Sequence, residues 1–190
     1  MDKTDGSLSK KKKKKKGNTS WVVLVITMTF VISISMSFVT NSLTENLNLA
    51  FAVVILLCII AVGIVFDIIG IAVTAADETP FHALASKKKK GAKAAIRLIR
   101  NAEKVSSFCN DVVGDIAGII SGSTAAVIVI YIVNAFRIKS DIVPGMIITA
   151  LVASLTVGGK AVGKSFAMKK SYHIVRFTAN VLSLFGFGKK

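Results

Sequence analysis

The chain has 190 residues, of which 53% are hydrophobic and 18% are charged, and its formal net charge is +15. This length allows one compact domain and excludes two large ones. A mean hydropathy of +0.66 excludes disorder over most of the chain. Long apolar runs alternate with dense lysine runs, which is the composition of a small polytopic membrane protein and not of a soluble globular protein.

The first element in chain order is a polybasic tail over residues 1–20, which we expect to be disordered and cytoplasmic. Its lysine run, Lys10–Lys16, binds anionic lipids or only fixes the orientation of the chain, and these two interpretations are compatible. An uncharged stretch from Trp21 to Thr40 follows. This stretch is too long for the apolar core of a signal peptide, and no A-x-A-like cleavage site follows it. Segment 21–48 is therefore predicted to be an additional, uncleaved transmembrane helix with its outer loop.

Three further apolar segments are long enough to cross a bilayer, which takes about 20 helical residues. They cover about residues 49–76, 108–133 and 142–168. The last of these is the least regular, because its apolar core ends near Val157. Together with the first anchor, these segments predict an all-α integral membrane protein with four transmembrane helices and amphipathic juxtamembrane helices.

Lysine and arginine counts predict the topology of these spans. Eight of these residues precede Trp21, eight lie between positions 77 and 107, and seven lie from Lys160 to the end. The loop 41–48 has none, and the loop 134–141 has two. The positive-inside rule therefore predicts a multi-pass protein of a bacterial inner membrane or a plasma membrane, with both termini in the cytoplasm.

Two polar stretches have helical periodicity, with apolar residues on one side and basic or polar residues on the other. One covers residues 91–105 within the juxtamembrane connection 77–107, and the other lies in the C-terminal segment 171–190, from Tyr172 to Phe187. Both predict amphipathic helices. We expect these helices to lie on the inner leaflet in contact with anionic lipids. The alternative is that they pack onto a partner helix.

Four charged residues fall within the predicted spans, at similar depths in the inner half of the bilayer. They are Asp67, Asp111, Asp115 and Lys160. A charge at the bilayer centre costs about 2.5–3.5 kcal/mol on insertion scales, so these groups need partners. Carboxylate oxygens at one depth suit a hard divalent cation such as Mg²⁺, and Asn110 adds a neighbouring oxygen donor. The alternatives are that Lys160 pairs with the aspartates only to join helices, or that Asp111 and Asp115 lie at the water interface.

Glycines four residues apart recur on two of the predicted spans, where they are expected to permit close helix approach. They are Gly114, Gly118 and Gly122 on one span, and Gly159 and Gly163 on another. The second pair lies in a stretch, Gly158 to Ser165, that fits the P-loop pattern letter for letter. No predicted strand precedes this stretch and no alternating strand–helix units surround it, so we expect no nucleotide there.

The sequence has no residue pattern that is typical of an enzyme. The cysteines, Cys58 and Cys109, form neither a disulfide framework nor a metal knuckle, and the histidines, His82 and His173, are far apart in the chain. Topology explains the basic residues, and no basic platform with interleaved aromatic residues predicts nucleic-acid binding. We therefore expect a protein that is not an enzyme and has no nucleic-acid partner.

Four short stretches occur in a characteristic order between about residues 49 and 170. They are FDIIGIAV at 66–73, RLIRNAEK at 97–104, SSFCNDVVGD at 106–115 and GKAVGK at 159–164. This order resembles the transmembrane domain of the CorB/CorC–cyclin M (CNNM) family of magnesium transporters. In that family the corresponding elements are F-S-x-x-E-x-A-L, a basic juxtamembrane stretch, a G-N-N-x-x-N-like helix opening and G-E-x-x-P-K.

The resemblance covers about two thirds of the chain and includes no counterpart of the family's cytoplasmic CBS domains. It implies an α-helical homodimer that binds a largely dehydrated Mg²⁺, often with Na⁺ as a coupling ion. The family's ion ligands map to Asp67, Asp111, Asp115 and Lys160. The family has a serine in place of Asp67 and asparagines in place of Asp111 and Asp115. It has a glutamate in place of Lys160 and a proline in place of Gly163.

These features are compatible with two functions. In the first, the chain transports a divalent cation, with Mg²⁺ as the preferred ion. Its ligands are Asp67, Asp111 and Asp115, with Asn110 as a further donor and Lys160 as a counter-charge. In the second, Lys160 neutralises the aspartates permanently, and the chain is a non-transporting membrane scaffold or regulatory subunit. We expect the first function.

Overall fold

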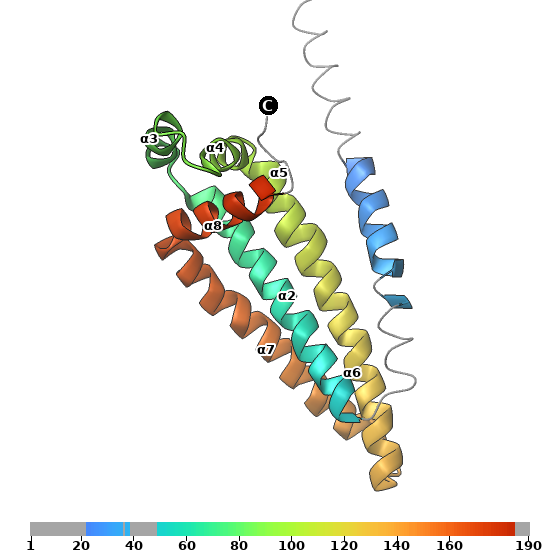
Figure 1. Cartoon of the computed structure of the whole chain (residues 1–190). Coiled ribbons are helices and arrows are strands. Elements are labelled where there is room, and N and C mark those ends of the chain that lie inside the picture. The colour runs from blue at the N-terminus through green and yellow to red at the C-terminus, as the bar shows by residue number, and fades with distance from the viewer. Residues whose placement is uncertain (1–21, 36, 39–48, 185–190) are drawn as a thin grey trace, which may run out of the picture.

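The chain folds into a bundle of helices, which the computed structural model describes over residues 22–35, 37–38 and 49–184 (Figure 1). All regular structure in these residues is helical. After an apolar helix, Val22–Ser35, the elements are α2 (Leu49–Ala75), α3 (Thr79–Ser86), α4 (Ala92–Arg100), α5 (Ala102–Ser107), the π-helix η1 (Phe108–Gly114), α6 (Asp115–Phe136), α7 (Ile142–Lys169) and α8 (Ser171–Leu184). The predicted polybasic tail 1–20 and the outer loop 41–48 lie outside the described residues.

Three of the described helices are long and apolar enough to cross a membrane. They are α2 with 27 residues, the continuous helix Ala102–Phe136 with 35, and α7 with 28. The predicted helices 49–76 and 142–168 are confirmed to within one residue at each end, whereas the predicted helix 108–133 belongs to the longer helix that begins at Ala102. The predicted first span is described as the shorter apolar helix Val22–Ser35 and residues 37–38. A fourth crossing therefore stays a prediction, because a crossing takes about 20 residues.

Helix α2 lies between α6 and α7 and contacts both along its length (Figure 1). Its buried residues Ala52, Leu56 and Ile60 pack against α6 and α7. Closer to the end that bears the short helices, Gly63 lies against Ala117 of α6, and a Cβ added to the glycine would be 2.9 Å from the Ala117 Cβ. The absence of a side chain at Gly63 therefore sets the separation of α2 and α6.

Helix α7 packs against α2 along a line of glycines. Cβ atoms added at Gly159 and Gly163 would meet the side chains of Ile64 and Ile68 on α2, with a separation of 2.8 Å between the Gly163 position and Ile68 Cγ1. The close approach predicted at these two glycines is therefore confirmed. The other sides of α7 are apolar and largely exposed, with Val162 at 74%, which suits a helix that faces lipid or another chain.

The short helices α3, α4 and α8 form a layer across one end of the long helices (Figure 1). Phe81 of α3, Leu98 of α4 and Val175 of α8 are buried in one cluster with Val73 of α2. The apolar side of α4 therefore faces protein. Helix α8 buries Val175 and Ala179, whereas Phe177 and Leu184 of its predicted apolar stripe are exposed. The other side of α4 carries basic residues.

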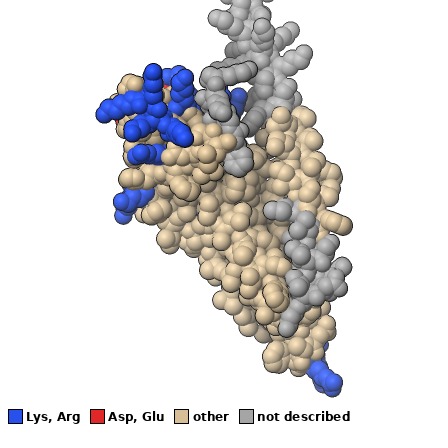
Figure 2. All heavy atoms as spheres, in the orientation of Figure 1, with Lys and Arg blue, Asp and Glu red and all other residues tan. Residues whose placement is uncertain are grey.

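Lysine and arginine side chains gather over this layer, at the end where α3 and α4 lie (Figure 2). A smaller basic group lies at the opposite end of the molecule, where α6 joins α7 (Figures 1 and 2). The long sides between the two ends show almost no charged atoms in this view. The basic residues seen in this view are therefore concentrated at the two ends of the bundle, and most of them lie over the layer of short helices.

The predicted amphipathic helix 91–105 is divided at Asn101. Helix α4 begins after Gly91, whose φ of +78° is left-handed, and ends one residue before Asn101. The backbone N–H of Asn101 donates to the Arg97 carbonyl at 3.2 Å, and its Nδ2 donates to the same oxygen at 2.8 Å. A side-chain amide that binds a helical carbonyl competes with the helix, which accounts for the break between the layer and the long helix.

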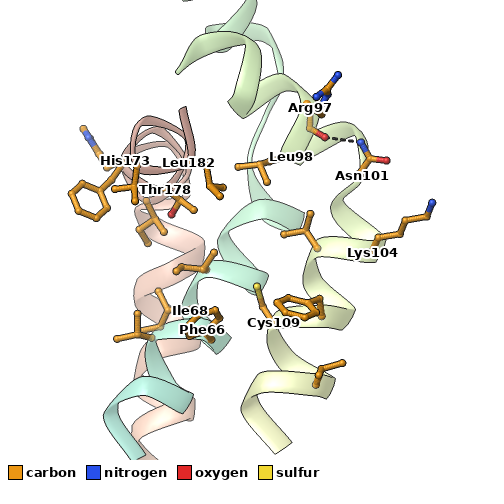
Figure 3. Close-up of a pocket in the computed structure, with 18 of the residues that line it drawn as sticks. Phe66, Ile68, Arg97, Leu98, Asn101, Lys104, Cys109, His173, Thr178 and Leu182 are labelled. Carbon is orange, nitrogen blue, oxygen red and sulfur yellow. Dashed lines mark hydrogen bonds between the residues drawn. The ribbon is translucent and has the colours of Figure 1, made fainter. Parts of the chain in front are cut away.

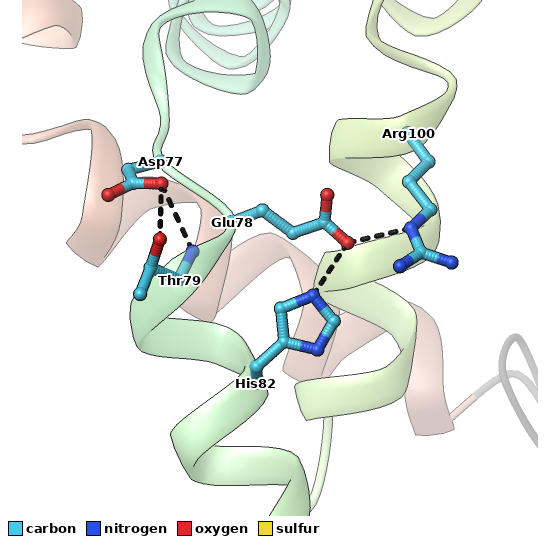
Figure 4. A network of polar contacts seen from close by, with 5 residues as sticks. All are labelled: Asp77, Glu78, Thr79, His82 and Arg100. Carbon is cyan, nitrogen blue, oxygen red and sulfur yellow. Dashed lines mark hydrogen bonds and ion pairs between the residues drawn. The ribbon is translucent and has the colours of Figure 1, made fainter.

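Glu78 joins α3 to α4 through two polar contacts (Figure 4). Its Oε1 accepts a hydrogen bond from Arg100 Nε at 2.6 Å and lies 2.9 Å from His82 Nε2. The hydrogen bond from Arg100 is the main cause that lowers the pKa of Glu78, desolvation opposes it, and His82 lowers it further. The adjacent Asp77 accepts hydrogen bonds from the backbone N–H and the hydroxyl of Thr79, which lower the pKa of Asp77.

Replacing Gly63 by alanine should destabilise the bundle, whereas the same change at Gly158 should not. The new methyl group at position 63 would lie 2.9 Å from the Cβ of Ala117, which has no rotatable side chain, so α2 and α6 must separate. Overpacking of this kind costs about 1–3 kcal/mol. At Gly158, in the interior of α7, nothing in the described residues lies within 4 Å of the added atom, and helix propensity favours alanine by about 1 kcal/mol. Thermal unfolding in detergent measures both variants, and equal midpoints would contradict the close contact.

Acidification should loosen the contact between α3 and α4. Because the pKa of Glu78 is lowered in the folded chain, this contact stabilises the fold above the usual carboxyl pKa and is lost as the pH falls through the lowered value. Hydrogen-exchange rates of the α3 amides, after correction for the intrinsic pH dependence of amide exchange, should rise severalfold as the pH is lowered from about 6 to about 3. Glu78→Gln should show the faster rates already at the higher pH. The control is Glu103→Gln, at an exposed position of α5, and equal rates in the two variants would contradict the role of Glu78.

Candidate functional site

A π-helical turn interrupts the long helix where the predicted site residues lie. The segment η1 joins α5 to α6 and contains Asn110 and Asp111. Such turns are rare and occur frequently at functional sites, where the wider turn breaks the regular hydrogen-bond ladder. The sequence predicted a regular helix here. Asp111 and Asp115 are therefore separated by a turn that is wider than the α-helical i, i+4 relation assumed from the sequence.

Asn110 places a polar side chain between η1 and α2. Its Nδ2 donates to Ser106 Oγ at 3.2 Å, whereas its Oδ1 is buried and receives no hydrogen bond from the described residues. This oxygen lies against Gly70 of α2, where an added Cβ would overlap it. A buried acceptor without a donor costs about 1–3 kcal/mol. Asn110 Oδ1 is therefore an oxygen that a donor or a cation would stabilise.

Lys160 reaches from α7 to the end of η1. Its Nζ lies 3.4 Å from the position that a Cβ on Gly114 would occupy, so the missing side chain at Gly114 gives the ammonium group room. The lysine is half-buried. An ammonium group has three donors and no acceptor, so it cannot ligate a metal while it is protonated. At this position it acts as a positive charge beside η1.

The three predicted carboxylate ligands differ in their surroundings. Asp67 is half-buried on α2, whereas Asp111 and Asp115 are exposed, and the Asp111 carboxylate accepts a hydrogen bond from Ser107 Oγ at 2.8 Å. In the part of the chain that the structure describes, no ion pair joins Lys160 to any of these aspartates. In the same residues, no group of three or more His, Cys, Asp or Glu side chains is placed to hold a metal ion. A single chain thus brings an amide and an ammonium group to the junction of α2, η1 and α7 but does not gather the three carboxylates.

Asp111 and Asp115 begin an exposed face that follows η1 and α6. It continues through Gly118 and Gly122, where an added Cβ would meet no atom of the described residues within 4 Å. It also includes Ile119, whose exposed fraction is 62%. The close helix approach predicted at Gly118 and Gly122 therefore does not occur among the described residues, which leave this face uncovered.

Three residues of the site were not recognised in the sequence. Gly70 makes room for Asn110, and the hydroxyls of Ser106 and Ser107 bind Asn110 and Asp111 respectively. Each serine precedes its partner by four residues, which is the helical spacing at which side chains meet. This spacing was a usable signal for the serines. A single glycine in an apolar helix gave no comparable signal for Gly70.

Residues 158–165, which fit the P-loop pattern, are helical throughout as part of α7. A P-loop cradles phosphate with the backbone of a glycine-rich loop between a strand and a helix. In α7 the same backbone groups belong to the interior of a helix. Gly159 and Gly163 of this stretch instead serve the contact with α2.

Comparisons with known proteins do not assign the chain to a family. No protein-family model, curated protein or solved structure gives a significant match to it. The resemblance to the CNNM transmembrane domain therefore depends on the residues quoted above, and the function must be argued from the junction of α2, η1 and α7.

Proposed function

We propose that the chain is a multi-pass membrane protein that transports a divalent cation, with Mg²⁺ as the preferred ion. In this proposal it lies in an inner or plasma membrane with both termini in the cytoplasm. Three long apolar helices with exposed apolar sides support a membrane location, and the basic residues over the layer support the orientation (Figure 2).

The observation that carries the proposal is the buried, unpartnered Oδ1 of Asn110 within the π turn. Hard divalent cations bind oxygen ligands, and a buried acceptor that lacks a protein donor is such a ligand. The oxygen lies against Gly70, which is about one helical turn from Asp67 on α2. Asp67 is therefore the carboxylate with which Asn110 would share a cation.

A second copy of the chain completes the site in this proposal. Asp111 and Asp115 are exposed on a helix that would cross the bilayer, and a charge facing lipid costs about 2.5–3.5 kcal/mol at mid-depth. Gly118 and Gly122 continue this face and permit a helix to approach closely. A homodimer through α6 would cover the carboxylates and bring additional oxygen ligands to the cation.

The position of Lys160 favours a second candidate function. Its ammonium group lies against Gly114, next to Asp115 in the sequence, where a positive charge substitutes for a cation. In this alternative the chain is a non-transporting scaffold or regulatory subunit whose aspartates are neutralised by Lys160 across the dimer. The two functions predict opposite effects of removing the lysine charge.

Mg²⁺ flux into proteoliposomes tests the transport function directly, with an encapsulated Mg²⁺-sensitive dye as the readout. Asp67→Asn should lower the flux at least about tenfold, because the variant removes a negative charge from the site. A loss of about 1.4 kcal/mol in the free energy of Mg²⁺ binding corresponds to a tenfold loss of affinity. The matched control is Asp141→Asn, at the carboxylate that precedes α7 outside the site, and it should retain the flux. Absence of protein-dependent flux under sodium and pH gradients, with a folded dimer, would exclude transport.

Lys160→Gln separates the two candidate functions. If the site binds Mg²⁺, removing the positive charge of Lys160 from beside η1 should raise the Mg²⁺ affinity at least about tenfold, because the ammonium group and the cation repel each other. If Lys160 only neutralises the aspartates, the variant should unfold at lower temperature and Mg²⁺ should stabilise neither form. Thermal unfolding with and without Mg²⁺ measures both effects. Lys164→Gln, at an exposed position one turn further along α7, is the control for charge loss alone.

A further inference from the structure

A cavity of about 730 Å³ lies in the layer of short helices, between the α3–α4 turn, the start of α4 and the end of α8. Its polar lining residues are four lysines and two serines, namely Lys88, Lys89, Lys90, Lys93, Ser86 and Ser183. No aspartate or glutamate of the described residues lines it. The volume is within the range of about 300–1,000 Å³ that is typical of small-molecule sites. The cavity is therefore large enough for a small ligand, and its ionisable lining is entirely cationic.

Backbone hydrogen bonds hold the lysines on a defined turn. The N–H of Lys88 donates to the Ala85 carbonyl at 3.0 Å, and the N–H of Lys89 donates to the Leu84 carbonyl at 3.1 Å. This pair of bonds is the Schellman arrangement that ends a helix, with Lys88 in the left-handed region at a φ of +52°. A lysine run without such bonds would lose conformational freedom on binding a ligand, whereas this run is preorganised.

Helix α8 forms the opposite wall of the cavity. It approaches the α3–α4 turn closely at Gly91, where an added Cβ would overlap the side-chain amide of Asn180. Ser183 lies about one helical turn after Asn180 and lines the cavity together with the lysines. Two segments that are far apart in the sequence therefore form the cavity, so it is not a property of the lysine run alone.

The charge of the four lysines is not balanced within the described part of the chain. The ion pairs found there join Glu78 to Arg100 and to His82, and none of the four lysines takes part in one. The sequence between Glu78 and Glu103 contains no acidic residue. The first turn of α4 adds partial positive charge, since its N-cap residue, Gly91, supplies no side-chain hydrogen bond. An anion in the cavity would therefore be stabilised by several positive groups at once.

A larger cavity, of about 1150 Å³, does not offer such a site. It lies between the helix Val22–Ser35, α2, the α5–η1 segment and α8, and its lining is almost wholly apolar. The charged ends of Arg97 and Lys104 extend away from it (Figure 3). Of these two cavities, only the one beside the α3–α4 turn combines a concave shape with a cluster of lysines.

We propose that the cavity beside the α3–α4 turn binds a ligand with two or more clustered phosphate groups. Lysine ammonium groups bind phosphate through charge-assisted hydrogen bonds. A phosphate monoester carries a charge of about −1.5 to −2 at pH 7, so two such groups balance the four lysines. A phosphorylated lipid headgroup and a soluble polyphosphate share this chemistry, and competition between probes separates them. The assignment does not depend on cation transport, because none of these residues is a proposed ion ligand.

Isothermal titration calorimetry of the full chain in non-ionic detergent tests the proposal, with tripolyphosphate as the probe and Mg²⁺ omitted. One tripolyphosphate should bind per chain. The double variant Lys88→Gln and Lys90→Gln should lower the affinity at least about tenfold, because it removes two charged hydrogen-bond donors. Lys169→Gln with Lys170→Gln removes the same charge at the α7–α8 junction, outside the cavity, and should have little effect. Absence of saturable binding, or an equal loss in both double variants, would overturn the proposal.

A carboxylate introduced on α8 distinguishes the cavity from a lysine run that binds anions by itself. Ser183→Asp adds a negative charge to the cavity wall and should lower the affinity for tripolyphosphate at least about tenfold. Ser171→Asp makes the same change at the other end of α8. That position is about 18 Å away at about 1.5 Å per residue, beyond the Debye length of about 8 Å at physiological ionic strength, so it should have little effect. Circular dichroism checks the fold, and equal affinities of the two variants would contradict a site beside α8.

Competition against bound tripolyphosphate identifies the source of the phosphate groups. The competitors are a phosphatidylinositol bisphosphate with short acyl chains and its free headgroup. Stronger displacement by the lipid than by the headgroup assigns a membrane lipid to the cavity. Equal displacement by the two assigns a soluble ligand. Displacement by neither competitor would show that the cavity does not select clustered phosphates and would overturn the proposal.

Discussion

The close approach of α2 to its two long neighbours is the constraint on which the rest of the structure depends. In lipid there is little hydrophobic force between helices, so association depends on packing and is favoured where small residues let backbones come close. Gly63 provides this contact with α6, and Gly163 provides it with α7. Because α2 contacts both helices, these glycines fix where the ends of α6 and α7 lie relative to α2, and therefore where η1 and Lys160 lie.

Glycines also make room for polar groups near the layer of short helices. Gly70 leaves space for the Asn110 amide, and Gly114 leaves space for the Lys160 ammonium group. Both polar groups are thus placed inside the bundle without displacing an apolar side chain. Glycine along α2 and η1 has two uses in this protein, which are to bring helices together and to admit hydrogen-bonding groups between them.

Length and apolarity predicted α2 and α7 to within one residue because a membrane-crossing helix needs only a long apolar run. Spacing could not predict which glycines meet another helix, since the pattern at Gly118 and Gly122 is the same as that at Gly159 and Gly163. Nor could depth predict a cluster of aspartates, because it fixes position along the bilayer normal and leaves the direction of the side chain undetermined. The π turn and the break at Asn101 arise from local hydrogen bonding, which periodicity does not reveal.

The π turn has a consequence for the angular phase of the long helix. Successive residues of an α-helix are turned by about 100°, so a helical wheel drawn straight through Ala102–Phe136 loses its register across η1. The end near the layer packs Val105 against the cluster that holds Phe81 and Leu98, while Gly118 and Gly122 of α6 lie on a side that the described residues leave uncovered. One continuous helix thereby serves two surfaces whose angular relation is set by seven π-helical residues.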